Sequence, residues 1–381
     1  HPSPTNAFRL WQTFVDNVDP LVKIVHTPTV QSRFLQAIMM PDGIEPSFEA
    51  LMFAIYYAAT ISSQATETRE VSLSEHRTSE LAKYRWGLNH SLAAAGFFQR
   101  SRDVVSLQAF VIYLVGNKPY CHQLLIPCVW TLVSLAIRVG MRVGLHQEQP
   151  SQARTPFEIE MHRRLWWQIC TLDTRSAEDE GTLPLISQAM SKTPLPSNIA
   201  DADLHAEMSQ MPKVSKSGTA MFYNNGRIET TQGLRNILFV DATSHSEEVE
   251  KSPSLQNKIE AIDTLENRVQ SEYFDHCDTK IPLCNFAVTT IRLVFLKARL
   301  TLHISHSNRP VEWCPEIDDF LFNTSVDILE RTQALVTSHQ YERWWWLFRT
   351  YVEWDALALV LRGLCRKPDR TNASRAWAAI E

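Results

Sequence analysis

The clearest hydrophobic pattern along the chain lies between residues 129 and 143. Apolar and small residues recur there at steps of three and four and form one stripe: Val129, Leu132, Val133, Ala136, Ile137, Gly140 and Val143. Arg138 and Arg142 fall off this stripe. Such a period is typical of an amphipathic helix that faces a core. The pattern therefore predicts a helix over 129–143.

Residues 158–176 carry two adjacent apolar stripes, which predicts a helix largely surrounded by other helices. Asp173 lies on the second stripe together with Trp166, Ile169 and Cys170. A buried carboxylate without a partner is costly, so we expect Asp173 to be paired. The nearby candidates are three arginines: Arg163, Arg164 and Arg175.

Helical spacing returns at 8–15, near 255–269, over 286–303 and over 317–364, where we expect two further helices. Between these segments, residues 201–254 are rich in Ser, Thr, Asn, Glu and Lys. They predict an irregular surface excursion, an insertion or a mobile lid, with one short helix. No alternating strand pattern occurs. The predicted fold class is all-α, a large multi-helix regulatory domain over 1–381 with this excursion, 201–254, in its middle.

Composition and charge narrow the functional classes. The chain of 381 residues has as many Trp as Gly, eleven of each, which favours long helices packed around rings over a turn-rich β fold. Its longest apolar run, 50–61, is shorter than the roughly 20 residues needed to cross a bilayer, so no membrane partner is expected. The net charge of −5 argues against a surface built to hold nucleic acid phosphates.

The cysteines do not form a recognisable framework. Their number is odd and their spacing scattered, which favours a reducing compartment over disulfides: Cys121, Cys128, Cys170, Cys277, Cys284, Cys314 and Cys365. A binuclear zinc cluster needs six closely spaced thiolates, and no Cys-x-x-Cys pair occurs here. The pairs Cys121/Cys128 and Cys277/Cys284 have nothing to complete a metal site. We predict no metal and no cofactor in this chain.

No catalytic constellation stands out. The sequence has no Gly-rich phosphate loop and no His-Glu-x-x-His helix, and no motif brings a nucleophile, a base and an orienting group together. We therefore predict no catalytic residues, and an enzyme is the less favoured interpretation.

Three blocks of sequence resemble the fungal-specific transcription factor domain, also called the middle homology region. The first is 10–31 (LWQTFVDNVDPLVKIVHTPTVQ), continued by 48–59. The second joins 136–146 (AIRVGMRVGLH) to 163–181 (RRLWWQICTLDTRSAEDEG), and the third is 345–365. The RRLWW block with its following Asp, Arg, Ala and Gly is the most specific signal. With the intervening helices, the resemblance covers essentially the whole chain.

The resemblance implies a nuclear regulator, often of metabolic or secondary-metabolite gene clusters. Members carry an N-terminal six-cysteine zinc cluster that binds DNA, usually as a dimer, and a helical middle domain that regulates activity and in some members senses a small molecule. This chain begins at His1 without a methionine, and its seven cysteines do not include the six closely spaced ones of such a cluster. Zinc and DNA contact are therefore expected only in a missing N-terminal module. The family pattern contains no catalytic residues.

One departure from the family pattern lies at Glu353-Trp354-Asp355, where members commonly show Gln-Trp-His. Helical spacing places Asp355 on the apolar side with Tyr351 and Ala358. An inward Asp355 beside Arg349 is compatible with a polar anchor in a small-molecule pocket. The simpler interpretation, which we favour, pairs Asp355 with an arginine or histidine of the core.

The tryptophan clusters at 166–167 and 344–346 also allow two interpretations. They can line an aromatic cavity, or they can fill gaps between helices, which is the commoner role of rings at such spacing. The candidate ligand-binding residues are Trp166, Asp173, Trp345, Arg349, Tyr351, Trp354 and Asp355.

The leading hypothesis is a ligand-sensing regulatory domain that takes a hydrophobic small-molecule effector. The alternative is a domain of this kind used without its zinc cluster as a stand-alone small-molecule-binding protein or enzyme of secondary metabolism. A third hypothesis is a scaffold in a DNA-bound complex. A homodimer is compatible with a helical domain of this size, but no long heptad specifies a partner.

Overall fold

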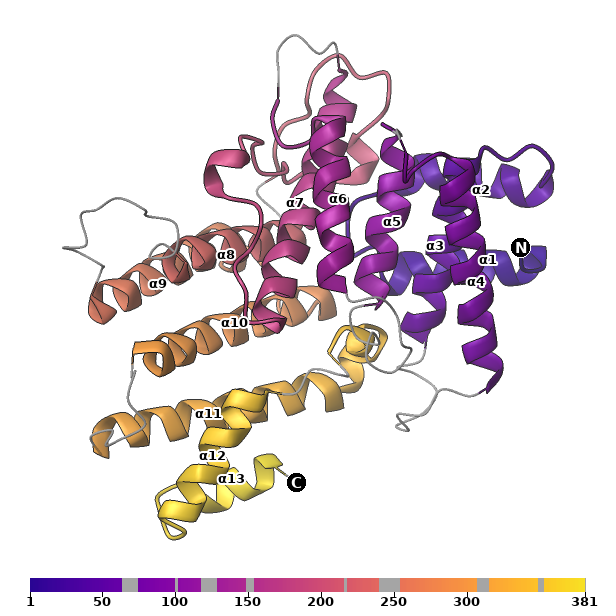
Figure 1. Ribbon diagram of the computed structural model, residues 1–381. Helices are drawn as coiled ribbons and strands as arrows, with labels where there is room; N and C mark the ends of the chain where they lie inside the picture. The colour runs from indigo at the N-terminus through magenta and orange to yellow at the C-terminus, as the bar shows by residue number, and fades with distance from the viewer. Residues whose placement is uncertain are drawn as a thin grey trace. The chain divides into compact units, whose positions relative to one another are not determined.

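The computed structural model describes residues 1–63, 75–99, 102–117, 129–148, 154–215, 218–239, 254–306, 315–348 and 353–380. Over these residues the chain folds into helices and contains no strand, which confirms the predicted all-α class (Figure 1). The chain divides into two compact units. Unit 1 consists of His1–Ile228 with Arg343–Thr350, and unit 2 of Glu229–Glu342 with Tyr351–Glu381.

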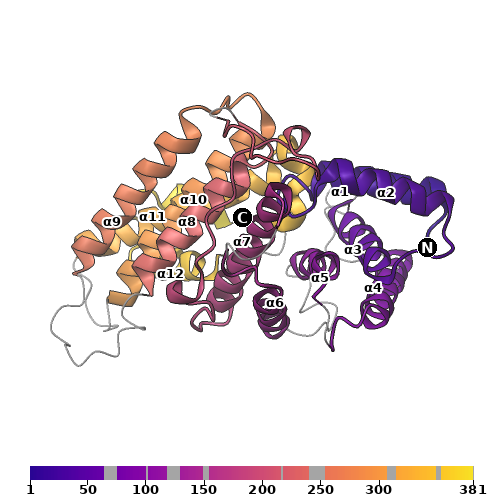
Figure 2. The same cartoon turned by 90° about the horizontal axis from the view of Figure 1, so that it is seen from above.

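Unit 1 contains seven helices among its described residues before residue 180: α1 (Pro4–Asn17), α2 (Thr27–Met39), α3 (Pro46–Ser62), α4 (Glu75–Ala94), α5 (Val104–Asn117), α6 (Val129–Val143) and α7 (Pro156–Asp179). Helix α3 packs against α1, α4 and α5, and α6 packs against both α5 and α7 (Figure 2). Proline occupies one of the first two positions of α1, α2, α3 and α7. A proline there loses no helical hydrogen bond.

Helix α3 forms the centre of the α1–α5 group. Nearly all of its residues are buried, polar Ser47, Thr60 and Ser62 included, as expected for a helix that is apolar on every side. Gly87 of α4 lies against it so closely that a Cβ at this position would sit 2.6 Å from the ring of Phe53. This close approach explains a glycine in the middle of a helix.

Helices α6 and α7 confirm two of the helices expected from periodicity. The bounds of α6 match the predicted range, and Val129, Val133, Ala136, Ile137 and Gly140 of the predicted stripe are all buried. Helix α7 begins with a capping box, in which the Thr155 side chain accepts from the backbone N–H of Glu158 and the Glu158 side chain accepts from that of Thr155. This pairing satisfies two backbone donors at the helix start.

The segment after α7 lies along that helix and is held by its side chains. It contains two short 3₁₀ turns, η3 (Gln188–Met190) and η4 (Asp201–Asp203). The indole N–H of Trp166 donates to Oγ of Ser191 at 2.8 Å, and that of Trp167 donates to the carbonyl of Pro194 at 2.8 Å. The η4 turn belongs to unit 1 and forms part of the site described below.

The polar stretch 201–254 contains more helix than the short one expected. Helix α8 (Phe222–Leu238) occupies 17 residues of it, while 240–253 lie outside the described residues. Polarity misled the prediction because Asn224, Asn225, Glu229 and Thr230 are buried. The amide of Asn225, for example, donates to the carbonyl of Pro196 at 3.1 Å.

Unit 2 contains the second part of α8 and five further helices among its described residues: α9 (Leu255–Val269), α10 (Pro282–His306), α11 (Pro315–Thr337), α12 (Trp354–Arg366) and α13 (Ala373–Ile380). Helix α10 packs between α9 and α11, and α12 and α13 pack on α11. A π-helical turn η6 (Gln270–Phe274) follows α9. The 3₁₀ helix η7 (His339–Leu347) begins in unit 2, while its tryptophan cluster at 344–346 belongs to unit 1. In the described part of the chain, no helix is both long and apolar enough to span a membrane.

Candidate functional site

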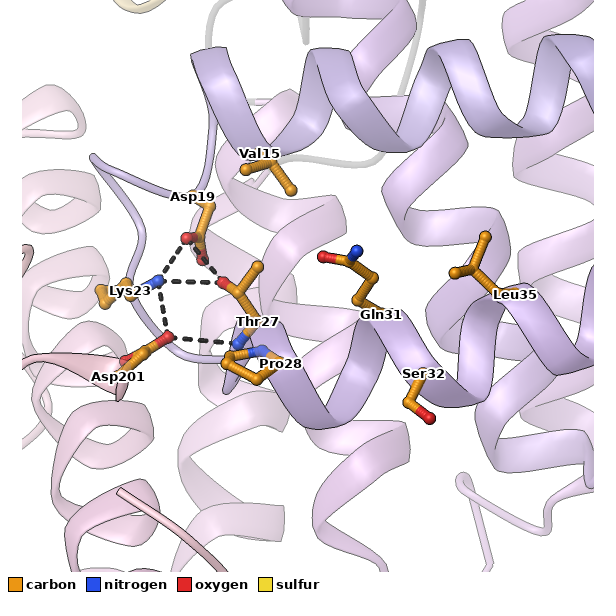
Figure 3. A pocket seen from close by; sticks show the side chains of 9 residues that line it. All are labelled: Val15, Asp19, Lys23, Thr27, Pro28, Gln31, Ser32, Leu35 and Asp201. Carbon is orange, nitrogen blue, oxygen red and sulfur yellow. Dashed lines mark hydrogen bonds and ion pairs between the residues drawn. The ribbon is translucent and has the colours of Figure 1, made fainter. Parts of the chain in front are cut away.

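A pocket of about 640 Å³ lies beside the first turns of α2, in unit 1 (Figure 3). Its walls come from the end of α1, the α1–α2 connection, α2 and the η4 turn. The lining residues are Val15, Asp19, Lys23, Thr27, Pro28, Gln31, Ser32, Leu35 and Asp201. This volume lies within the range of about 300–1,000 Å³ that is usual for small-molecule pockets, and the pocket is broadly open to solvent.

The α1–α2 connection explains how charged residues reach the interior here. Leu21, Val22, Ile24 and Val25 are all almost fully buried, and Lys23 stands between them. Burial of its neighbours carries Lys23 inside as well, where only 5% of its surface is exposed. An ammonium so deeply placed needs anionic partners.

Lys23 has three partners around its ammonium group. It binds Oδ2 of Asp19, Oδ2 of Asp201 at 2.8 Å, and Oγ1 of Thr27 at 3.0 Å. The hydroxyl of Thr27 in turn donates to Oδ2 of Asp19 at 2.9 Å. Figure 3 shows these contacts converging on Lys23 from both sides. The three protons of the ammonium are therefore all committed within the protein.

Asp201 comes from a distant part of the sequence and caps the start of α2. Its Oδ2 accepts from the backbone N–H of Thr27 at 3.2 Å. Its carbonyl lies 2.9 Å from Nε2 of His26, the residue that precedes the helix. His26 makes no side-chain cap bond to this helix. A carboxylate at a helix N-terminus satisfies a free backbone donor and interacts favourably with the helix dipole.

The same carboxylate connects the pocket to α7. Nη1 of Arg164 donates to Oδ1 of Asp201 at 2.7 Å, and Nε donates to Oε1 of Glu160 at 3.2 Å. Both α7 side chains are fully buried. Glu160 also accepts from the backbone N–H of Ser197 at 3.1 Å, and Nη2 of Arg164 donates to the carbonyl of Ile199 at 3.3 Å. One continuous charged network thus joins α2, η4 and α7.

The network contains three carboxylates, Asp19, Asp201 and Glu160, and two cations, Lys23 and Arg164. Burial raises the pKa of Asp19 against the lowering effect of Lys23, and it raises the pKa of Glu160 against that of Arg164. Although burial also opposes the ionisation of Asp201, Lys23 and Arg164 together hold its pKa below the ordinary value. Asp201, with two cationic partners, is the most firmly ionised of the three.

Asp19 has an oxygen that the network does not use. Its Oδ2 accepts from Lys23 and Thr27, whereas Oδ1 is buried and has no hydrogen-bond partner within the part of the chain that the structure describes. A buried acceptor without a donor costs roughly 1–3 kcal/mol. This oxygen is closed to solvent, so the unpaired acceptor lies inside the protein and not at the surface of the pocket.

Two of the residues predicted to bind a ligand, Trp166 and Asp173, belong to α7. Trp166 is fully buried and, with Ile169, packs against Gly140 of α6. Asp173 is buried and accepts from the backbone N–H groups of Leu185 and Ile186 at 3.0 and 2.8 Å. Asp173 therefore has hydrogen-bond partners, as expected, and the two donors named here are backbone amides. Of the arginines expected beside it, Arg163 binds Glu148 and Arg164 binds Glu160 and Asp201.

The remaining predicted ligand residues come from the C-terminal block. Trp345 is half-buried in η7, next to Trp346, whose indole N–H donates to the carbonyl of Asn17 at 3.2 Å. Arg349 and Tyr351 lie outside the described residues. None of the predicted ligand residues is among those that line the pocket beside α2.

The expectation that Asp355 points inward is wrong. Asp355 is exposed, and Trp354 beside it is 70% exposed. Helix α12 buries a different stripe, made of Ala356, Val360, Gly363 and Leu364. This stripe packs on α11 and decides which side of the helix faces the core. Asp355, in the first turn of α12, lies off the stripe and is therefore exposed.

The cysteines that the structure describes are Cys170, Cys277, Cys284 and Cys365, and none of these four forms a disulfide. Burial, together with a hydrogen bond to Cys284, raises the pKa of Cys277 to about 12. Cys121, Cys128 and Cys314 lie outside the described residues. Within the described ranges, no group of three or more His, Cys, Asp or Glu side chains is placed to hold a metal ion.

The pocket residues were missed because their sequence signal is weak. Asp19, Lys23 and Thr27 follow one another at steps of four within the first family-like block, and a single lysine within an apolar run is the one local hint of a buried charge. Asp201 and Arg164 lie far away in the sequence. No local pattern links them to Lys23.

Comparison with known proteins finds similarity to fungal transcription factors. The model of the fungal specific transcription factor domain matches residues 11–271. The aurofusarin cluster transcription factor aurR2 of Gibberella zeae is 31% identical over 386 residues, which cover 100% of this chain and 56% of that protein. The transcriptional regulator AacuB of Aspergillus aculeatus is 30% identical, with 100% and 51% covered. The C6 finger domain transcription factor adaR of Aspergillus niger is 26% identical, with 100% and 50% covered.

The chain spans about half the length of the curated relatives it matches. The family model covers more than half of the chain, and the similarity to aurR2 extends over all of it. The chain therefore belongs to the fungal specific transcription factor domain family.

Proposed function

We propose that this chain is the regulatory region of a transcription factor that controls a gene cluster of secondary metabolism. The observation that carries the proposal is its 31% identity, over its whole length, to a protein named as an aurofusarin cluster transcription factor. A second relative, 28% identical over 100% of this chain, is named as a transcription factor of the pyriculol/pyriculariol biosynthesis cluster in Pyricularia oryzae.

We propose further that the region acts in the nucleus and that another part of the protein contacts DNA. The acidic net charge of −5 disfavours phosphate binding by this region itself. Relatives such as adaR, which is named as a C6 finger domain transcription factor, are about twice as long as the stretch matched here. A zinc-bound finger of that kind would supply the DNA contact.

The regulatory signal in this proposal is a small molecule that occupies the pocket beside α2. Two features support the site. The pocket has a suitable volume, and its wall belongs to the charged network that joins α2, η4 and α7. A ligand that changes the position of Asp19 or Lys23 therefore acts on contacts that reach two other elements of unit 1.

The test is an in-frame deletion, in the native gene, of the codons for residues 11–271 of this chain, followed by RNA sequencing of the host. The proposal predicts a change in the transcripts of one physically clustered set of biosynthetic genes, restored when the intact gene is returned. Unchanged transcripts together with a lost metabolite would refute transcriptional control. That outcome would favour the stand-alone binding protein or enzyme instead.

A further inference from the structure

We propose that helix α12 carries a face through which this chain pairs with a second copy of itself, with the two α12 helices running antiparallel. This outer face of α12 consists of Trp354, Ala358, Leu361 and Cys365. The inference goes beyond the proposed function and does not rest on it. The face belongs to unit 2, whereas the pocket beside α2 belongs to unit 1.

Helix α12 is apolar on two sides. One side is buried and packs on α11 (Figure 1). On the other side, Trp354 is 70% exposed and Leu361 is 40% exposed, and Ala358 and Cys365 are exposed as well. A helix at a protein surface usually turns a polar side to water. Four exposed apolar residues in one line form a patch, and such a patch is typical of an interaction surface.

The spacing of the outer face is the same in both directions along the helix. Its residues follow one another at steps of four, three and four, the spacing that keeps a seam between two paired helices. In an antiparallel pair, Trp354 of one copy therefore faces Cys365 of the other, and Ala358 faces Leu361. Each larger side chain meets a smaller one, which lets the layers interdigitate. A parallel pair would instead set Trp354 against Trp354.

The charges beside the outer face complement one another only in the antiparallel pair. Asp355, Arg362 and Arg366 lie on one flank of the face, because steps of seven and four keep residues on the same side of a helix. Reversal of the helix about its midpoint sets Asp355 of one copy between Arg362 and Arg366 of the other, about 3 Å along the axis from each. Charges at such flanking positions decide the partner and the direction of paired helices.

These two features favour a second copy over a partner of another kind. A two-fold interface uses the same surface patch on both molecules, so the patch must complement itself. The outer face meets this condition in the sizes of its side chains and in the charges on its flank. An unrelated partner would require neither the reversible spacing nor an acidic and a basic group at matching heights.

The size of the helix sets the strength that we expect. Helix α12 has 13 residues and is about 20 Å long. A contact through one such helix from each copy lies at the low end of specific interfaces, which begins below about 1,200 Å². We therefore expect a reversible dimer in the micromolar range. Sedimentation equilibrium of the 381-residue chain under reducing conditions should show the average mass rising from monomer to dimer with concentration, and no further.

Two tryptophan variants test the face itself. Trp354 and Trp86 of α4 are almost equally exposed, at 70% and 69%. Trp354→Glu places a charge in the proposed contact, so we expect the dimer to dissociate at least about tenfold more readily. Trp86→Glu makes the same exchange outside the contact and should leave the dissociation constant within about twofold of that of the unmodified chain. Equal effects of the two variants would overturn the inference.

A second pair of variants keeps the test valid if Trp354→Glu does not fold. Asp355 and Asp42 are both exposed. Asp355→Arg would set a third positive charge beside Arg362 and Arg366 of the second copy, so we expect a weaker dimer, most clearly at low salt. Asp42→Arg changes the net charge by the same amount and should have no effect. A dimer of Asp355→Arg as tight as that of the unmodified chain would contradict the proposed pairing.

A cross-linking experiment tests the direction of the pair. In the antiparallel pair, a thiol introduced by Trp354→Cys faces Cys365 of the second copy. The two Cys365 thiols lie eleven residues apart along the axis, about 16 Å, which is too far for a disulfide. With glutathione disulfide as the oxidant, we expect a covalent dimer of Trp354→Cys that disappears when Cys365→Ser is added.

Three outcomes of these experiments overturn the inference: the unmodified chain stays monomeric at every concentration, the covalent dimer persists after Cys365→Ser is added, or the unmodified chain cross-links through Cys365 itself. The last outcome would identify a parallel pair. None of them bears on the control of genes, because a monomeric chain would still change transcripts if the proposed function is correct.

Discussion

At the scale of single residues, the most consequential feature is a set of buried charges that hold three elements together. Arg164 is 1% exposed and binds Glu160 and Asp201, and Lys23 binds Asp201 from the other side. Removal of one partner from a buried ion pair leaves an uncompensated charge and typically costs about 3–5 kcal/mol. The network therefore makes unit 1 sensitive to single substitutions at these positions.

Arg164→Met is the first prediction at this scale. It leaves Glu160 and Asp201 without their shared cation, so we expect the free energy of unfolding, measured with urea, to fall by about 3–5 kcal/mol. Arg33→Met is the matched control, since Arg33 is 43% exposed and pairs with the exposed Glu45. Exposed pairs contribute about 0–1 kcal/mol. Similar losses in the two variants would contradict the account of the buried network.

His162 gives the second prediction, which concerns pH. Burial, reinforced by the nearby Arg154, lowers the pKa of His162 from 6.5 to about 4, while Glu158 and Glu148 oppose the shift. The unfolded chain therefore takes up a proton as the pH falls below about 6.5, and the folded chain does so only near pH 4. The contribution of this histidine to stability is full above pH 6.5 and is lost as the pH falls through that window.

We expect the intact chain to lose roughly 1–2 kcal/mol more than His162→Gln between pH 7 and pH 5, in urea unfolding at both pH values. The glutamine variant serves as the reference because it keeps a polar side chain of similar size and does not titrate. Parallel losses in the two proteins would show that His162 is not held neutral by the fold.

At the scale of helices, the sequence pattern predicted helices whose buried face is a regular apolar stripe. It underestimated a helix whose buried polar residues are paired with distant parts of the chain. Helix α6 was predicted at its observed bounds because its apolar stripe is uninterrupted. Helix α8 was underestimated because its buried face includes Asn224 and Asn225, whose partners are the carbonyls of Pro20 and Pro196. A polar residue satisfied by a distant carbonyl looks, in the sequence, like a residue of the surface.

The capping box of α7 supports a prediction at this scale. Thr155→Ala removes the side-chain acceptor for the backbone N–H of Glu158, so we expect a loss of about 1 kcal/mol in the free energy of unfolding. The matched control is Ser3→Ala at the start of α1, because Ser3 makes no side-chain cap bond. The control should change stability by less than about 0.5 kcal/mol. An equal loss at both helices would mean that the capping contact is not what stabilises α7.

At the scale of the whole molecule, the sequence was sufficient for the fold class and the family but not for the candidate site. The family-like blocks depend on local runs of residues, and the family match over 11–271 confirms the assignment. The pocket depends on Asp201 reaching the start of α2, 174 residues away. Only tertiary structure brings these groups together. Sequence pattern therefore predicted a ligand site at tryptophans and at Asp355, and Asp355 is exposed.

The central claim is that this chain regulates a set of genes through the pocket beside α2. The most direct measurement is RNA sequencing of hosts that carry Ser32→Trp or Gln36→Trp in the native gene, at equal protein levels. Ser32 lines the pocket, whereas Gln36, one turn further along α2, does not. The genes to follow are those whose transcripts change when the codons for residues 11–271 of this chain are deleted. We predict that Ser32→Trp alters these transcripts and that Gln36→Trp leaves them as in the unmodified strain. Identical transcripts in all three strains would contradict the claim.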